Sequence, residues 1–148
     1  MILLTIFIGM IITLHMSMNA YAGHLAGNTK MANLVFWAMG LSTSIIISFT
    51  QKDPGFMKRA MGIPPWLFLA GGIGAAISLF TNSAIPLIGS ANLTMLLLAG
   101  QLAASVVVSH FGIMGSPLEP VAWYKIAGVA LAGLGAALSI YGGKLFPR

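Results

Sequence analysis

Five long apolar segments limit what this chain can fold into more than any other feature. They cover residues 2–22, 31–50, 66–82, 92–111 and 123–143. A helix needs about 20 apolar residues to cross the hydrocarbon core of a bilayer, which is about 30 Å thick. In lipid, helices also satisfy every backbone polar group within one segment. The pattern therefore predicts an all-α integral membrane protein with five transmembrane helices in a single domain, residues 1–148.

The composition agrees with this prediction. Hydrophobic residues make up 58% of the chain and charged residues only 6%, and the mean hydropathy is +0.96. A soluble domain carries about 25% charged residues, so this chain could not cover a water-facing surface of ordinary polarity. The basic residues are scattered between apolar segments, which suits lipid headgroups and not nucleic acid. Cysteine is absent, so disulfides and cysteine-based metal sites are excluded. We expect neither a metal nor a cofactor.

The first apolar segment has a second interpretation, because Ala20-Tyr21-Ala22 resembles the cleavage site of a signal peptide. No Lys or Arg precedes the apolar residues, although signal peptides normally carry such a charge. We therefore expect a retained helix. Trp66 and Trp123 support the proposed boundaries, because aromatic rings settle at the headgroup level where helices enter the membrane.

Five spans place the two termini on opposite sides, so the basic residues on each side can be counted. One side carries four basic residues: Lys52, Lys58, Arg59 and Lys125. The other side carries three: Lys30, Lys144 and Arg148. Orientation is set by an excess of Lys and Arg on the cytoplasmic side. Four against three is almost no excess, so we expect the chain to insert in both orientations.

Polar residues form thin stripes on the predicted helices. His15 and Asn19 are four residues apart and share one face of the first helix. His15 is the one ionisable side chain deep within a span, which makes it a candidate for proton coupling. A neutral histidine that donates to a neighbouring carbonyl is an equally good interpretation. The remaining stripes include Trp37, Ser44 and Ser48 on the second helix, Gly74, Ser78 and Asn82 on the third, and Thr94, Gln101, Ser105 and Ser109 on the fourth.

These polar residues differ in what they predict. Intramembrane hydroxyls usually bond back to their own helix or to a neighbouring helix. An unpaired carboxamide costs several kcal/mol in hydrocarbon, so Asn19 and Gln101 must face a partner or water. Structural clamp and substrate contact are equally plausible for both. On the fifth helix, a seam of small residues predicts helix or dimer packing: Gly128, Ala132, Gly135 and Ser139.

Acidic residues are missing from all five spans, because Asp53 and Glu119 both lie in loops. No buried carboxylate is therefore expected to hold a cation or to exchange it for protons. The sequence also lacks a nucleophile–base pair, a zinc-protease motif and a glycine-rich phosphate loop. We therefore expect that the chain is not an enzyme.

Several of these segments together resemble the small YdcZ-like family of the drug/metabolite transporter superfamily. The resemblance is carried by His15-Met16-Ser17-Met18-Asn19-Ala20, Trp66 with Gly71-Gly72-Ile73-Gly74, Gly100-Gln101-Leu102, His110-Phe111-Gly112 and Gly128. The motifs keep the family's order over nearly the whole chain. At two positions the chain departs from the family: His15 stands where a glutamine is usual, and Ser109 stands where an acidic residue is frequent.

The resemblance implies a five-helix half-transporter that pairs with an inverted copy of itself in the bacterial inner membrane. Inverted repeats allow alternating access around a site at their interface. We expect a cavity lined by His15, Asn19, Trp37, Asn82, Gln101 and Ser105 from both chains. Without a carboxylate in the spans, the expected cargo is a small neutral or weakly anionic metabolite, and export follows from the family. The alternatives are a small multidrug-resistance-type cation exporter and a non-transporting membrane scaffold or accessory subunit.

Overall fold

The structure is a computed structural model that describes residues 1–50 and 53–145. Within these residues it is all-helical, and five helices are long and apolar enough to cross a membrane. The chain divides into two compact units, Met1–Leu87 and the chain from Ile88 onward, which are described separately. The prediction of an all-α protein with five spans is confirmed.

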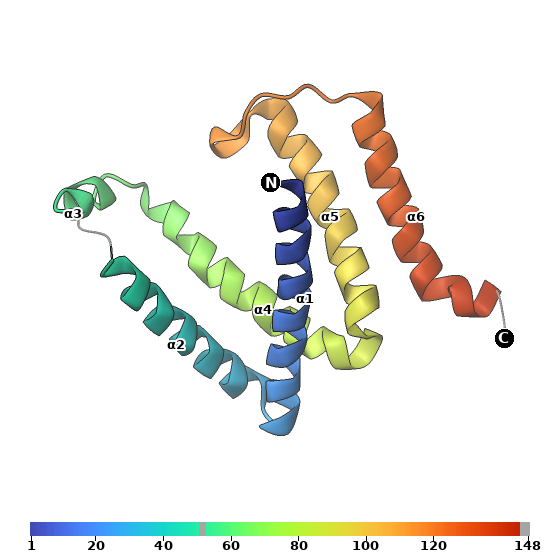
Figure 1. The fold of residues 1–148 in the computed structure, drawn as a ribbon, viewed down its shortest axis with the longest axis horizontal. Coiled ribbons are helices and arrows are strands. Elements are labelled where there is room, and N and C mark those ends of the chain that lie inside the picture. Colours follow the sequence, from blue (N-terminus) through green and yellow to red (C-terminus); the bar gives the residue numbers. More distant parts are fainter. Residues whose placement is uncertain (51–52, 146–148) are drawn as a thin grey trace. The chain divides into compact units, whose positions relative to one another are not determined.

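The first unit contains three spans and a short helix (Figure 1). Its elements are α1 (Ile2–Leu25), α2 (Thr29–Ser48), α3 (Phe56–Ala60) and α4 (Leu69–Ile88), which is preceded by a 3-10 turn at Pro65–Phe68. Gly27 ends the first helix with a φ of +62°, a conformation that glycine adopts at little cost. Asn28 then caps α2, since its side chain accepts a hydrogen bond from the backbone N–H of Met31 at 3.1 Å.

The second unit is a pair of spans, α5 (Ser90–Phe111) and α6 (Trp123–Leu145), with a 3-10 turn at Ile113–Gly115 between them. Gly112 ends α5 in the left-handed conformation, with a φ of +60°. Two bonds hold the following loop against the end of α5. The N–H of Glu119 donates to the carbonyl of Ser109 at 2.8 Å, and the N–H of Val121 donates to Nδ1 of His110 at 3.2 Å.

The helix boundaries differ from the predictions by a few residues, and one difference has a clear cause. The third span was expected to end at residue 82, before Pro86, but α4 continues to Ile88 with Pro86 inside it. That expectation was wrong. Proline has no backbone N–H to donate to the carbonyl four residues earlier. In a membrane helix, neighbouring groups can satisfy that freed carbonyl, so a proline in the last turn does not have to end the helix. The other four spans begin at Ile2, Thr29, Ser90 and Trp123, and they end at Leu25, Ser48, Phe111 and Leu145.

Burial within the chain is the reverse of that in a soluble protein. Among the described residues, the buried apolar side chains are Ala20, Ala84, Leu93 and Ala136, whereas most large apolar side chains are exposed. The buried polar side chains are Asn19, Asn33, Thr81 and Asn82. Small residues allow helices to approach, and polar side chains join them, as is usual where the surroundings are lipid. The apolar exterior suits a bilayer or a second protein chain.

Candidate functional site

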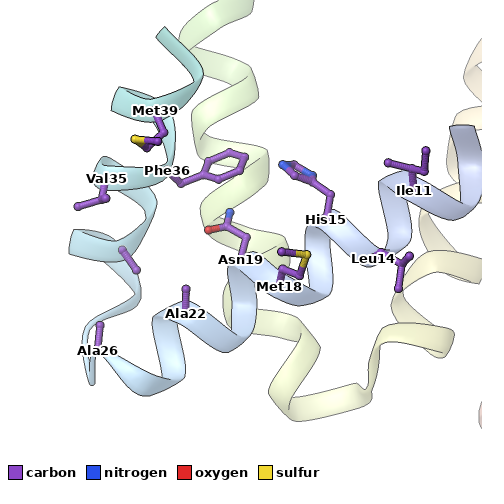
Figure 2. A pocket seen from close by; sticks show the side chains of 11 residues that line it. Ile11, Leu14, His15, Met18, Asn19, Ala22, Ala26, Val35, Phe36 and Met39 are labelled. Atoms are coloured by element: carbon purple, nitrogen blue, oxygen red, sulfur yellow. The ribbon is translucent and has the colours of Figure 1, made fainter. Parts of the chain in front are cut away.

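A cavity of about 640 Å³ lies between α1 and α2 in the first unit. This volume is within the range of small-molecule sites, about 300–1,000 Å³. Its walls are mostly apolar, and Figure 2 shows His15, Asn19 and Phe36 pointing into the same space. The lining residues are Ile11, Leu14, His15, Met18, Asn19, Ala22, Ala26, Ala32, Val35, Phe36 and Met39. No acidic side chain, lysine or arginine is among them.

His15 is placed by its contact with an aromatic ring on the opposite helix. Its imidazole lies 4.8 Å from the ring of Phe36, measured between centroids, with the planes tilted by 47°. Phe36 in turn meets Trp37 edge-on at 5.7 Å. Within the described part of the chain, the ring nitrogens of His15 form no hydrogen bond, so they are free to meet a ligand or water. Phe36 was not predicted as a site residue.

Asn19, one turn further along α1, belongs to a buried network that joins three helices. Its Nδ2 donates to Oγ of Ser78 on α4 at 3.3 Å. Ser78 donates to Oδ1 of Asn33 on α2 at 2.8 Å, and Asn82 donates to the same oxygen at 3.3 Å. Asn33 itself donates to the carbonyl of Ala75 at 3.3 Å. This network satisfies groups that would be costly to leave unpaired in a membrane.

Asn33 is the centre of this network, and the sequence analysis missed it. The polar stripe identified on the second helix began at Trp37 and ran toward Ser44 and Ser48. Both of those serines bond back to their own helix, at Gly40 and Ile45, as expected for intramembrane hydroxyls. Asn33 lies one turn before Trp37 and is the only carboxamide in α2. Its position on the stripe of Trp37 and its carboxamide could have identified Asn33 from the sequence.

The six expected cavity residues fall into different surroundings. Four belong to the first unit: His15 and Asn19 line the cavity, Asn82 is buried in the network, and Trp37 covers Gly74. A Cβ on Gly74 would lie 3.4 Å from the indole of Trp37, which is ordinary van der Waals contact. Gln101 and Ser105 belong to the second unit, on α5. A single cavity shared by all six remains a prediction.

A second cavity, of about 480 Å³, lies beside α5 and the start of α6. Ser105, Ser109 and Gly128 line it together with Glu119 and Lys125. The ammonium group of Lys125 binds the Glu119 carboxylate at 2.6 Å, and this lysine side chain is 24% exposed. The hydrogen bond and the positive charge of Lys125 lower the pKa of Glu119. The carboxylate therefore stays ionised at neutral pH, and the pair is lost only as pH falls through this lowered value.

The carboxylate beside this cavity was not predicted, because Glu119 was assigned to a loop outside the spans. It does lie in the loop, but the bond from its N–H to Ser109 folds that loop back onto α5. Ser109 was noted as a departure from the family, which often has an acidic residue there. In the structure, Glu119 supplies a carboxylate to the cavity that Ser109 lines. A bend that returns a loop onto its helix leaves no periodic signal in the sequence.

The predicted seam on α6 takes part in packing at only some of its positions. Ser139 donates to Oδ1 of Asn92 on α5 at 2.7 Å, and Ala132 is half-buried. Ala136 is the buried residue of α6. Gly128 and Gly135 are exposed, and a Cβ at either position would meet no described atom within 4 Å. These two glycines therefore remain a prediction for packing against a second chain.

Comparisons with known proteins bear out the resemblance seen in the sequence. A family model with the description "Putative inner membrane exporter, YdcZ" matches residues 1–138. The comparisons with curated proteins and with solved structures gave no match. The matched region contains the first four spans and most of the fifth. The family description is that of a membrane exporter. The chain therefore belongs to the YdcZ family and is a multi-pass protein of the inner membrane.

Proposed function

We propose that the protein exports a small neutral or weakly anionic metabolite by alternating access. The cavity between α1 and α2 carries this proposal. It combines apolar walls with two polar side chains, His15 and Asn19, and has no charged Asp, Glu, Lys or Arg in its lining. Such a surface favours a neutral molecule, because a charged one would lose its hydration without gaining an opposite charge. Family membership supports transport and its outward direction.

The working unit in this proposal is an antiparallel homodimer. The exposed apolar side chains of the single chain support it, since much of this surface needs lipid or a partner. Gln101 also needs a partner from outside the single chain. Its side chain is exposed, and within the described residues its carboxamide has no hydrogen-bond partner. A second copy, a ligand or water must satisfy this group within the membrane. We assign Gln101 and Ser105 to the substrate site and Gly128 and Gly135 to the dimer interface.

A cation exporter is the second candidate, and one observation favours it. The Glu119 carboxylate lines the cavity beside α5, where the hydroxyl groups of Ser105 and Ser109 donate to their own helix and keep lone pairs free. These acceptors suit a cation or a strong hydrogen-bond donor. The Glu119 carboxylate already forms an ion pair with Lys125, however, so a cationic cargo would have to displace the lysine.

A ligand screen on the purified protein, followed by transport in proteoliposomes, tests these proposals. A ligand present at 100 times its Kd should stabilise the protein by about 2.7 kcal/mol, which is visible as a rise in Tm. We expect neutral and weakly anionic compounds to raise the Tm and to be transported. Hits confined to organic cations would favour the second candidate, and a panel without transported hits would contradict both.

With such a ligand, Gln101→Leu should abolish transport while the protein still inserts and dimerises. The carboxamide has no partner within the described chain, so its removal should leave the folding of the unit unchanged. Thr43→Val is the matched control, since that hydroxyl bonds only to Met39 of its own helix. Transport and Tm are measured for both variants. Failure of Gln101→Leu to dimerise would make this residue a structural clamp instead.

Dual orientation is tested with reporter fusions at the C-terminus. The four-to-three distribution of basic residues predicts signal from both sides of the membrane. Lys58, Arg59 and Lys125 lie on one side in this count, and Lys30 and Lys144 on the other, whereas Lys52 and Arg148 are outside the described residues. Three lysines added to either side should shift the ratio strongly toward one orientation. A wild-type chain with one fixed orientation would contradict the antiparallel homodimer.

A further inference from the structure

The three helices of the first unit are joined unequally. Helices α2 and α4 share three hydrogen bonds, all centred on Asn33: to Ser78, Asn82 and the carbonyl of Ala75. Within the described residues, α1 is joined to α4 by one side-chain hydrogen bond, from Asn19 to Ser78 at 3.3 Å. Trp37 on α2 also packs over Gly74 on α4. Helices α2 and α4 are thus held more firmly to each other than α1 is held to α4.

Helices α1 and α2 touch through the rings of His15 and Phe36, whose centroids are 4.8 Å apart, and they pack tightly near their connecting turn. Gly23 and Thr29 meet there, and a Cβ on Gly23 would lie 3.3 Å from three atoms of Thr29. Ala20 is 3% exposed at the same end. Toward Ile11 and Met39 the cavity separates the two helices (Figure 2). The pair therefore has a tight base near Gly23 and an open end where side chains leave space for movement.

Asn19 lies where the tight base meets the cavity. Its Nδ2 is bound to Ser78, whereas its Oδ1 accepts no hydrogen bond from the described residues. The residue is 7% exposed and also lines the cavity. A molecule in the cavity that donates a hydrogen bond can therefore reach Asn19 and change its bond to Ser78.

We propose that Asn19 couples occupation of the cavity to movement of α1, which pivots at its base while α2 and α4 stay joined through Asn33. The proposal rests on the transport function proposed above and assigns Asn19 as a positioning residue. The Asn19–Ser78 bond forms when α1 lies against α4 and breaks when α1 swings away. A ligand that binds Asn19 shifts the balance between these two states by its different affinity for each.

The absence of cysteine allows a direct test, because a single introduced cysteine can carry a fluorine label for NMR. One label is placed at Leu14→Cys on α1 and, in a separate protein, another at Ile77→Cys on α4; both positions are exposed. Asn19→Ala should change the population or exchange rate of the Leu14 label by about three- to tenfold, the effect of losing one interhelical bond in a membrane. The Ile77 label should not change.

Asn82→Ala is the matched control, because it removes a carboxamide from the same network but keeps both partners of the bond to α1; only the longer bond from Asn82 to Oγ of Ser78, at 3.5 Å, is lost beside it. It should leave the Leu14 label unchanged. If Asn19→Ala misfolds, Asn19→Ser replaces it, since the shorter side chain also loses the bond to Ser78. Equal changes at both labels, or none at Leu14, would overturn the pivot and make the cluster a plain structural tie. The labels are measured without ligand, so this result does not depend on whether transport is observed.

Discussion

Asn33→Ala should lower the free energy of unfolding by about 2–3 kcal/mol, the largest effect among the variants proposed for the first unit. Asn33 takes part in three hydrogen bonds that join α2 to α4, and such bonds contribute about 0.6–1 kcal/mol each within a membrane. Its loss also leaves Asn82, which is 2% exposed, without its shortest hydrogen bond. Unfolding in a detergent–denaturant mixture measures the change.

Two control variants define what this result means. Ser44→Ala removes an exposed hydroxyl that bonds only to Gly40 of its own helix, and it should change stability by less than about 0.5 kcal/mol. The double variant Asn33→Ala/Asn82→Ala should be less destabilised than the sum of the two single variants, because the two residues share a bond. Two results would show that the network contributes no cooperative stability. The first is a double variant whose loss of unfolding free energy equals the sum of the two single losses, and the second is an equal loss for Asn33→Ala and Ser44→Ala.

The sequence was sufficient to predict the five spans because their signal is local. Each span is a continuous apolar segment, and lipid leaves a helix as the only satisfactory conformation for a segment of that length. The end of α4 was missed because Pro86 normally stops helices in water, where a broken helix can bond to solvent. Such an alternative is missing in hydrocarbon, so the helix continues to Ile88.

The candidate site was predictable only in part, because it depends on how helices meet. The spacing of His15 and Asn19 placed both on one face of α1, and both line the same cavity. Their partners come from other helices. Asn33 and Ser78 are 45 residues apart, and nothing in a helical repeat relates them. A hydroxyl was expected to bond either to its own helix or to a neighbouring helix, and Ser78 bonds to Asn33 on a neighbouring helix; the sequence did not indicate which of the two it would be.

The loop residues show a different limit of prediction. Glu119 and Lys125 are six residues apart across a loop and the start of α6, so no regular repeat brings them together. Their pairing depends on the turn after Gly112, which returns the loop to α5. The sequence analysis placed Glu119 in a loop and therefore expected no buried carboxylate that could hold a cation or exchange it for protons. In the structure, the Glu119 carboxylate lines the cavity beside α5. For this reason a cationic cargo is kept as the second candidate.

His15→Gln should remove the pH dependence of transport between about pH 5 and 8 while substrate binding is retained, because histidine titrates in that range and glutamine does not. Glutamine still offers hydrogen bonds at the same place, and it is the residue that the family usually has there. The imidazole of His15 lies against Phe36 in a cavity without any acidic, lysine or arginine side chain.

Transport by the reconstituted protein is measured as a function of pH, with ligand affinity measured in parallel. The matched control is His24→Gln, because His24 lies in the last turn of α1 and does not line the cavity. His110 is a less suitable control, since its Nδ1 accepts a bond from Val121 and holds the loop before α6. The control should keep the wild-type pH profile. A His15→Gln protein that transports with an unchanged profile would exclude proton coupling through His15 and leave this residue with the role of orienting substrate beside Asn19.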